Sequence, residues 1–139
     1  MLGRILVPVD GSDMATRALE YALEHHPDAD ITVLHVAGEP SPMMGKALSI
    51  ALETDVEEAA QEVAEEIFAD ARALAAEHGV EINTAVALGN PARQIVDHAS
   101  EYDAVMMGSH GGDLRSSLLM GNVASKVSRR APVPVTLVR

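Results

Sequence analysis

The sequence predicts an α/β fold, in which a parallel β-sheet carries helices on both faces. Three observations support this prediction. Five short runs are almost continuously apolar, as expected for strands that are buried on both sides. Amphipathic patterns with helical spacing separate these runs. Strands and helices therefore alternate along the chain, an order typical of parallel sheets with right-handed crossovers. The 139 residues suit a single domain, residues 1–139, with its own core.

The expected strands are short, and four of them contain few polar residues. They comprise Arg4 to Val9, Ile31 to Val36, Ile82 to Leu88, Ala104 to Gly108 and Val133 to Val138. The third is the least continuously apolar, which favours a position near the edge of the sheet. Pro8, Pro132 and Pro134 cannot donate to a hydrogen-bond ladder, so we expect them at strand ends or on an edge strand.

Two longer helices are expected before the middle of the chain. The first runs from Met14 to His25, with Ser12 or Asp13 as its N-cap. The second runs from about Asp55 to His78 and ends at Gly79, with a row of glutamates on its solvated side. Its expected buried stripe consists of Val56, Ala59, Ala60, Val63, Ile67, Ala71 and Leu74.

Two shorter helices follow. The first begins at Asn90-Pro91, with asparagine as N-cap and proline in the first helical position. Its apolar face comprises Ile95, Val96 and Ala99. The last helix runs from Asn122 to Arg130, with Val123 and Val127 pointing inward.

Residues 37–54, AGEPSPMMGKALSIALET, make a connection longer than usual between a strand and a helix. We interpret this segment as a mobile loop, a lid or an interaction segment. The alternative is a plain surface loop with the helix beginning near Ala47.

Composition excludes several classes of function. A net charge of −11 argues against binding nucleic acid through a general basic surface. Without cysteine the chain has no disulfides and no thiolate zinc site. No apolar window reaches the ~18 residues of a membrane span, and the first residues lack a secretory h-region, so we expect a cytoplasmic protein. Many acidic residues beside only two lysines suggest a halophilic source, the alternative being an ordinary acidic protein.

Two places combine polar residues with sharp turns at the carboxyl ends of expected strands, where open parallel sheets bind ligands. One is Asp10 in PVDGS, and the other is the stretch GSHGGDLRSSLLMGN, residues 108–122. Neither G-x-x-x-x-G-K-[ST] nor G-x-G-x-x-G occurs. The spacing of Gly108, Gly111 and Gly121 still suits a phosphate cradle. The first two glycines allow an anion nest, and the third begins a helix whose free amides favour an anion.

The chain resembles the ATP-binding type of universal stress protein. GSHG, nine residues and a glycine resemble that family's nucleotide-binding signature. RILVPVDGS, ITVLHV, GNPARQIVDHA, YDAVMMGSHG and PVPVTLVR resemble its other motifs in the same order, so the resemblance covers the whole chain. It implies a Rossmann-like open sheet of five parallel strands in the order 3-2-1-4-5. It also implies a stress-response regulatory homodimer, joined through the last strand, Val133 to Val138.

The resemblance further implies ATP in a cleft at the carboxyl ends of the strands. It places adenine near Pro8, Val9, Asp10 and Val36. It places ribose and phosphates near Gly108, Gly111, Gly121, Asn122 and Val123. Asp10 suits this role chemically, because a carboxylate accepts from an exocyclic amine or a hydroxyl. The alternative for Asp10 is an Asx-turn or a helix cap at the strand end.

Two residues depart from the family's pattern. Asn122 stands where a serine or threonine is usual, although asparagine can still cap the helix. Asp113 follows Gly112 where arginine is common, and its charge opposes a triphosphate unless Arg115 compensates or Mg²⁺ or Mn²⁺ bridges the two. We therefore expect either weaker ATP binding or a cation-bridged complex.

Two other functions remain open. One is a slow ATP hydrolase on the same scaffold, using Ser109 and His110, although no G-x-S-x-G elbow surrounds the serine. We favour His110 as a turn residue near ribose or phosphate. The other is a dimeric interaction module that binds no nucleotide. The remaining histidines lack metal-ligand spacing, and we expect His35 to be a hydrogen-bonded residue of the sheet or core.

Overall fold

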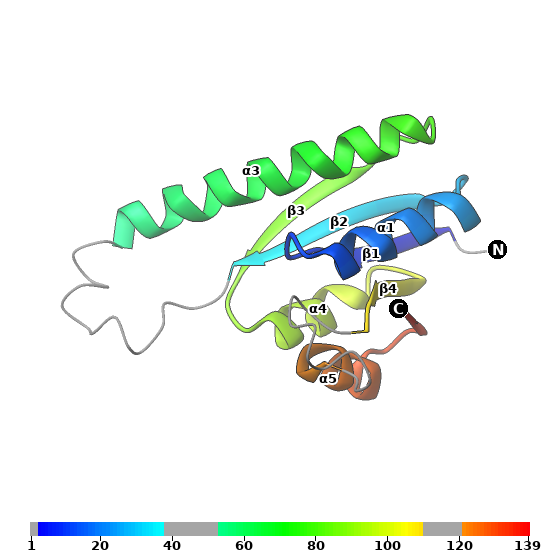
Figure 1. Ribbon diagram of the computed structural model, residues 1–139. Helices are drawn as coiled ribbons and strands as arrows, with labels where there is room; N and C mark the ends of the chain where they lie inside the picture. Colours follow the sequence, from blue (N-terminus) through cyan, green and yellow to red (C-terminus); the bar gives the residue numbers. More distant parts are fainter. Residues whose placement is uncertain (1–2, 38–52, 110–120) are drawn as a thin grey trace.

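The computed structural model describes residues 3–37, 53–109 and 121–139. Its five strands form one parallel sheet in the order β3-β2-β1-β4-β5, which confirms the predicted fold and strand order (Figure 1). The strands are β1 (Arg4–Pro8), β2 (Asp30–Ala37), β3 (Asn83–Leu88), β4 (Ala104–Gly108) and β5 (Val135–Val138). The helices are α1 (Asp13–His25), α3 (Glu53–Glu77), α4 (Pro91–Ala99) and α5 (Asn122–Arg130).

Strand β1 lies at the centre of the sheet, and β3 lies at one edge as predicted. Val9 follows β1 but still donates its amide to the carbonyl of Leu34 at 2.8 Å. Strand β5 begins two residues later than expected. The Pro134 carbonyl accepts from the Val105 amide at 2.9 Å, but proline has no N–H to extend the ladder.

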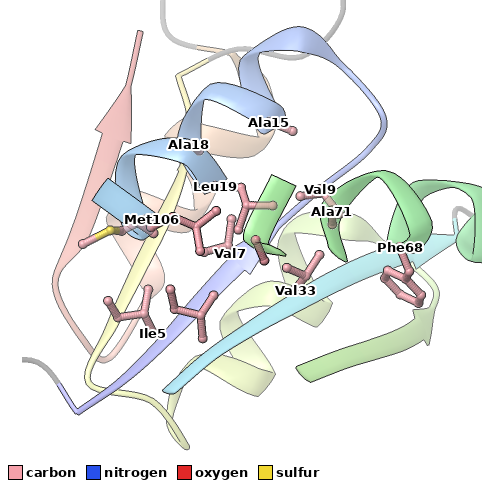
Figure 2. Close-up of a cluster of buried hydrophobic side chains, with 14 of the residues drawn as sticks. Ile5, Val7, Val9, Ala15, Ala18, Leu19, Val33, Phe68, Ala71 and Met106 are labelled. Carbon is pink, nitrogen blue, oxygen red and sulfur yellow. The ribbon is translucent and has the colours of Figure 1, made fainter. Parts of the chain in front are cut away.

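The sheet separates two hydrophobic clusters. On one face, α1 and α3 cover alternate residues of the central strands, such as Ile5, Val7 and Val33 (Figure 2). On the other face, α4 and α5 cover the intervening residues, such as Leu6 and Val105. Each central strand is therefore buried on both sides, which explains its continuous apolar sequence.

The buried face of α3 differs from the predicted stripe. Val63, expected inside, is 50% exposed, whereas Phe68 is 3% exposed and packs on the sheet (Figure 2). Ala64 and Ala75 are buried too, and the expected Ala71 is confirmed. The side chains of Val56, Ala59 and Ala60 lie outside the described residues. Ile67 and Leu74, also expected inside, are partly buried and pack against the same cluster. The buried face of the helix thus keeps part of the predicted stripe and extends toward Ala64, Phe68 and Ala75.

Helix starts match the predictions at two of three caps. Ser12, and not Asp13, caps α1 by accepting from the Ala15 amide at 3.2 Å. Asn90 caps α4 by accepting from the Arg93 amide at 3.1 Å. Helix α5 spans Asn122–Arg130 as predicted, but its N-cap is Gly121 and not Asn122, and Gly121 provides no side-chain capping bond.

The inward face of α5 also needs one correction. Val127 is fully buried as predicted, but Val123 is 36% exposed. Ala124 takes the inward position instead. The longest irregular segment, residues 38–52, and with it the expected lid or interaction segment, lies outside the described residues.

Candidate nucleotide-binding cavity

A cavity of about 240 Å³ opens at the carboxyl ends of β1, β2 and β4. It lies just below the ~300–1,000 Å³ usual for small-molecule sites. Its lining from the strands comprises Pro8, Val9, Asp10, Leu34, Val36, Met107 and Gly108. Its lining from the helix starts comprises Ser12, Ala15, Pro91, Ile95, Gly121, Asn122, Val123 and Ala124. It therefore lies where the order of strands reverses, beside central β1.

Eight residues singled out from the sequence line this cavity together. They are Pro8, Val9, Asp10, Val36, Gly108, Gly121, Asn122 and Val123. Ser109 is buried and is not part of the lining. His110, Gly111, Asp113 and Arg115 lie outside the described residues.

Asp10 makes the local turn that was the alternative interpretation of this residue. Its Oδ1 accepts from the amide of Ser12 at 2.9 Å, which is an Asx-turn at the end of β1. The turn leads the chain into α1. A carboxylate has about four acceptor positions, so this bond leaves capacity for a ligand donor. The two interpretations of Asp10 are therefore compatible.

Gly108 is explained by packing between two elements of the protein. A Cβ atom here would lie 2.9 Å from the Cβ of Met14 and 3.1 Å from its carbonyl carbon and oxygen. The first turn of α1 thus lies directly against the end of β4. The φ angle of Gly108 is not positive, so its conformation alone would allow any residue.

The two chain segments that flank residues 110–120 meet at the cavity. The Gly121 amide donates to the Ser109 carbonyl at 2.6 Å. The Ser109 amide in turn donates to the Val138 carbonyl at 2.9 Å. These bonds fix the start of α5 to the end of the sheet. They hold Gly108 and Gly121, which are separated by twelve residues, on one wall of the cavity.

Three helices begin at this cavity, and they differ in how their first amides are satisfied. Side chains cap α1 and α4, as described above, whereas Gly121 offers α5 no side-chain acceptor. The first amides of a helix have no partner within the helix itself. Those of α5, at Asn122, Val123 and Ala124, belong to residues that line the cavity. Free amides and the positive end of the helix dipole together favour an anion here.

Several apolar residues of the lining were not predicted from the sequence to belong to a site. Their sequence pattern is that of core residues, and all are buried: Leu34, Met107, Ile95, Ala15 and Ala124. A signal existed for two of them. Leu34 lies two residues before Val36 on the same side of β2, and Ile95 lies one helical turn after Pro91. These apolar groups give the inner part of the cavity a hydrophobic wall.

None of the described histidines lines this cavity. His35 is buried, and its Nδ1 lies 3.1 Å from the Val9 carbonyl, which confirms the expected hydrogen bond. Because a carbonyl only accepts, Nδ1 carries the proton. In residues 3–37, 53–109 and 121–139 no three His, Asp or Glu side chains are grouped to hold a metal ion. The helices of these same ranges include none long and apolar enough to span a bilayer.

Comparison with known proteins agrees with this architecture. The model of the universal stress protein family matches residues 1–139. Universal stress protein YxiE of Bacillus subtilis is 34% identical over 148 residues, covering 100% of both chains. Universal stress protein MJ0531 of Methanocaldococcus jannaschii is 31% identical, covering 98% of this chain and 81% of its own.

Solved structures show the same fold. Hypothetical protein MJ0577 superposes with a TM-score of 0.82 at 25% identity, covering 98% of this chain and 94% of its own. A universal stress protein in complex with cAMP and one from Archaeoglobus fulgidus in complex with dAMP have TM-scores of 0.69 and 0.64, both at 23% identity. They cover 99% and 100% of this chain, and 97% and 98% of their own. The family match and the relatives above 30% identity together show that this chain belongs to the universal stress protein family.

Proposed function

We propose that the strand-end cavity binds an adenine nucleotide, with ATP as the expected ligand. The observation that carries the proposal is the uncapped start of α5 on the wall of a cavity that is otherwise largely apolar. An apolar slot suits a flat base, and an uncapped helix start suits its phosphates. The two ends of the cavity thus match the two ends of a nucleotide.

In this proposal the base lies at the β1 and β2 side. Pro8, Val9 and Val36 contact adenine, and Asp10 accepts from its exocyclic amine or from a ribose hydroxyl. Gly108, Gly121, Asn122 and Val123 lie at the phosphate side. Gly111 also belongs to the phosphate side in this proposal, with Ser109 and His110 as its neighbours in the sequence; Gly111 and His110 lie outside the described residues.

The related structures support an adenine nucleotide as the class of ligand. One is a complex with cAMP, one with dAMP and one, from Arabidopsis thaliana, with AMP. Their identities to this chain are 18–23%, so the number of phosphates is a proposal made on this chain's own residues. Asp113 opposes a triphosphate unless Arg115 or a bound Mg²⁺ or Mn²⁺ offsets its charge.

Calorimetric titration with AMP and ATP, each with and without Mg²⁺, tests the proposal. We expect saturable binding of at least one nucleotide, and a larger gain from Mg²⁺ for ATP than for AMP. Absence of heat with both nucleotides under both conditions would contradict it. That result would favour the alternative, a dimeric interaction module that binds no nucleotide.

The variant Gly121→Asp separates binding from folding. Gly121 has φ −63° and ψ 158°, the extended conformation that a capping aspartate adopts. We expect unchanged or slightly raised thermal stability, because aspartate caps the helix. We expect nucleotide affinity to fall about tenfold or more, since a carboxylate then occupies the phosphate end. Gly121→Ala is the matched control and should retain much more of the affinity.

We further propose that residues 1–139 form one nucleotide-binding domain that acts as a stress-response regulatory homodimer without fast catalysis. Strand β5 lies at a sheet edge, and its four residues are only half-buried in the single chain. A second copy pairing there would cover that edge. Sedimentation should then give about twice the 14.7 kDa of one chain. A phosphate-release assay with ATP decides the alternative of slow hydrolysis, because steady turnover that His110→Ala abolishes would support it.

A further inference from the structure

A second depression lies between α4 and α5, apart from the nucleotide cavity. It has a volume of about 470 Å³, and we call it the basic hollow. Three cations line it, Arg93 of α4 and Lys126 and Arg130 of α5, beside Asn90, Val96 and a single carboxylate, Asp97. Within the described part of the chain, no residue lines both this hollow and the nucleotide cavity.

The charge of the hollow is opposite to that of the protein. The chain carries 21 acidic and 10 basic residues, yet three of those 10 meet here against one acidic residue. Two other described arginines have polar partners within the chain. Arg4 lies 3.8 Å from Asp30 and bonds the Glu101 carbonyl, and Arg72 donates to Thr84.

The three cations of the hollow have no such partners in the described ranges, where the one ion pair within 4.0 Å is that of Arg4 with Asp30. Asp97 follows Arg93 by four residues on α4. This is the less favourable order for such a pair along a helix, because a cation is better placed after the anion. The carboxylate therefore leaves the cations available.

Helix electrostatics alone does not account for these positions. Arg130 lies in the last turn of α5, where a cation is favoured. Arg93, however, is the third residue of α4, at the positive end of its dipole, and the first turn of α4 holds no acidic residue. Lys126 and Arg130 are four residues apart on one helix, where like charges repel. A bound anion would reverse each of these unfavourable interactions.

The neutral group at the hollow points to the same kind of ligand. The side-chain oxygen of Asn90 accepts from the Arg93 amide as the cap of α4. Its amide nitrogen, which can only donate, is left for an anion. Guanidinium and ammonium groups with an amide donor are the usual set for phosphate recognition. A single hollow offers too few cations for a long polyanion, and the net charge of −11 repels the rest of such a chain. A compact anion fits the hollow.

We propose that the basic hollow binds a compact phosphate-bearing anion with two or more negative charges. Its source is either free polyphosphate or the phosphates of a nucleotide other than the one in the strand-end cavity. Because the two sites share no described residue, this proposal can be tested independently of the proposed nucleotide site.

Amide NMR of the full chain during titration with tripolyphosphate and with ATP is the test. We expect saturable shifts at Arg93, Val96, Lys126 and Arg130. Shifts with tripolyphosphate identify free phosphate groups as sufficient, and shifts with ATP alone identify a nucleotide. Each of these results supports the hollow as a site.

The variant Arg93→Gln/Lys126→Gln/Arg130→Gln removes the cations and retains helix-forming residues. Each exposed cation contributes a factor of about two to three, so affinity at the hollow should fall about ten- to thirtyfold. Arg129→Gln is the matched control, because Arg129 lies on the same helix turn but does not line the hollow.

Three results would overturn the proposal. The first is the absence of shifts at the hollow with either probe. The second is an equal loss of affinity in the Arg129→Gln control. The third is a set of shifts that depends on protein concentration and not on probe, which would identify the hollow as a contact for an acidic face of another copy.

Discussion

Replacing Gly108 by alanine tests whether this glycine is required for packing within the protein or for ligand binding. The added methyl group would lie 2.9 Å from the Met14 side chain and 3.1 Å from its backbone, which cannot move aside as a side-chain end can. Overpacking of this kind costs about 2–3 kcal/mol. The loss of glycine's freedom in the unfolded chain returns about 0.4–1 kcal/mol. The net loss of stability is therefore about 1–2.5 kcal/mol.

Thermal denaturation without nucleotide measures this effect directly. For 139 residues, 1 kcal/mol corresponds to about 3–4 °C in Tm, so we expect Gly108→Ala to melt about 3–10 °C below the parent. Gly79→Ala is a useful comparison, because Gly79 has φ +68° with no atom near its Cβ position, and its cost is conformational alone. An unchanged Tm for Gly108→Ala together with lost nucleotide binding would refute the packing argument and assign the glycine to the ligand.

Three further predictions follow from the core and the surface. Phe68→Ala should lower stability by about 3–5 kcal/mol in urea denaturation, whereas Val63→Ala should change it by less than about 0.5 kcal/mol; equal effects would contradict the assigned face of α3. His35→Leu should cost about 1–3 kcal/mol, because the buried Val9 carbonyl loses its side-chain donor. If the acidic surface is an adaptation to salt, Tm should rise as KCl increases from 0.1 to about 2 M, and a fall would favour an ordinary acidic protein.

The fold was predictable from the sequence because local patterns decide it. Continuous apolar runs such as AVMMG are buried along their whole length only when helices cover both faces of the sheet. Asn90-Pro91 marks a helix start because asparagine caps the helix and proline suits its first position. The order of the strands came from the resemblance to a family. Boundaries shifted where a single hydrogen bond decided them, as at Pro134.

The buried face of α3 could not be predicted for a physical reason. The helix carries two adjacent apolar stripes, one through Val56 and Val63 and the other through Ala64 and Phe68, and Ile67 lies between them. Period 3.6 fits both stripes equally well. The choice between them depends on the sheet, because Phe68 packs over it (Figure 2), whereas Val63 is 50% exposed.

The polar residues and glycines of the candidate site were predictable, and much of its apolar lining was not. Asp10 follows β1 and Val36 lies near the end of β2, where the order of the strands fixes the ligand edge. Ala124 carries only a methyl group, and nothing in the sequence distinguishes it from other core residues, whereas the one signal for Ile95 is its place one helical turn after Pro91. Their place in the lining depends on how α4 and α5 pack against each other.

Gly108 and Gly121 belong to one sequence motif, yet each meets a different physical requirement. Gly108 is small because Met14 of α1 lies against it, and that contact would exist without any ligand. Gly121 has an ordinary extended conformation, and what matters there is the side-chain cap that it lacks. Asn122, the departure from the family's pattern, therefore follows the cap position and begins the helix itself. The Asn122 side chain does not cap α5. The first amides of the helix therefore stay without a helical partner at the cavity whatever residue stands at position 122.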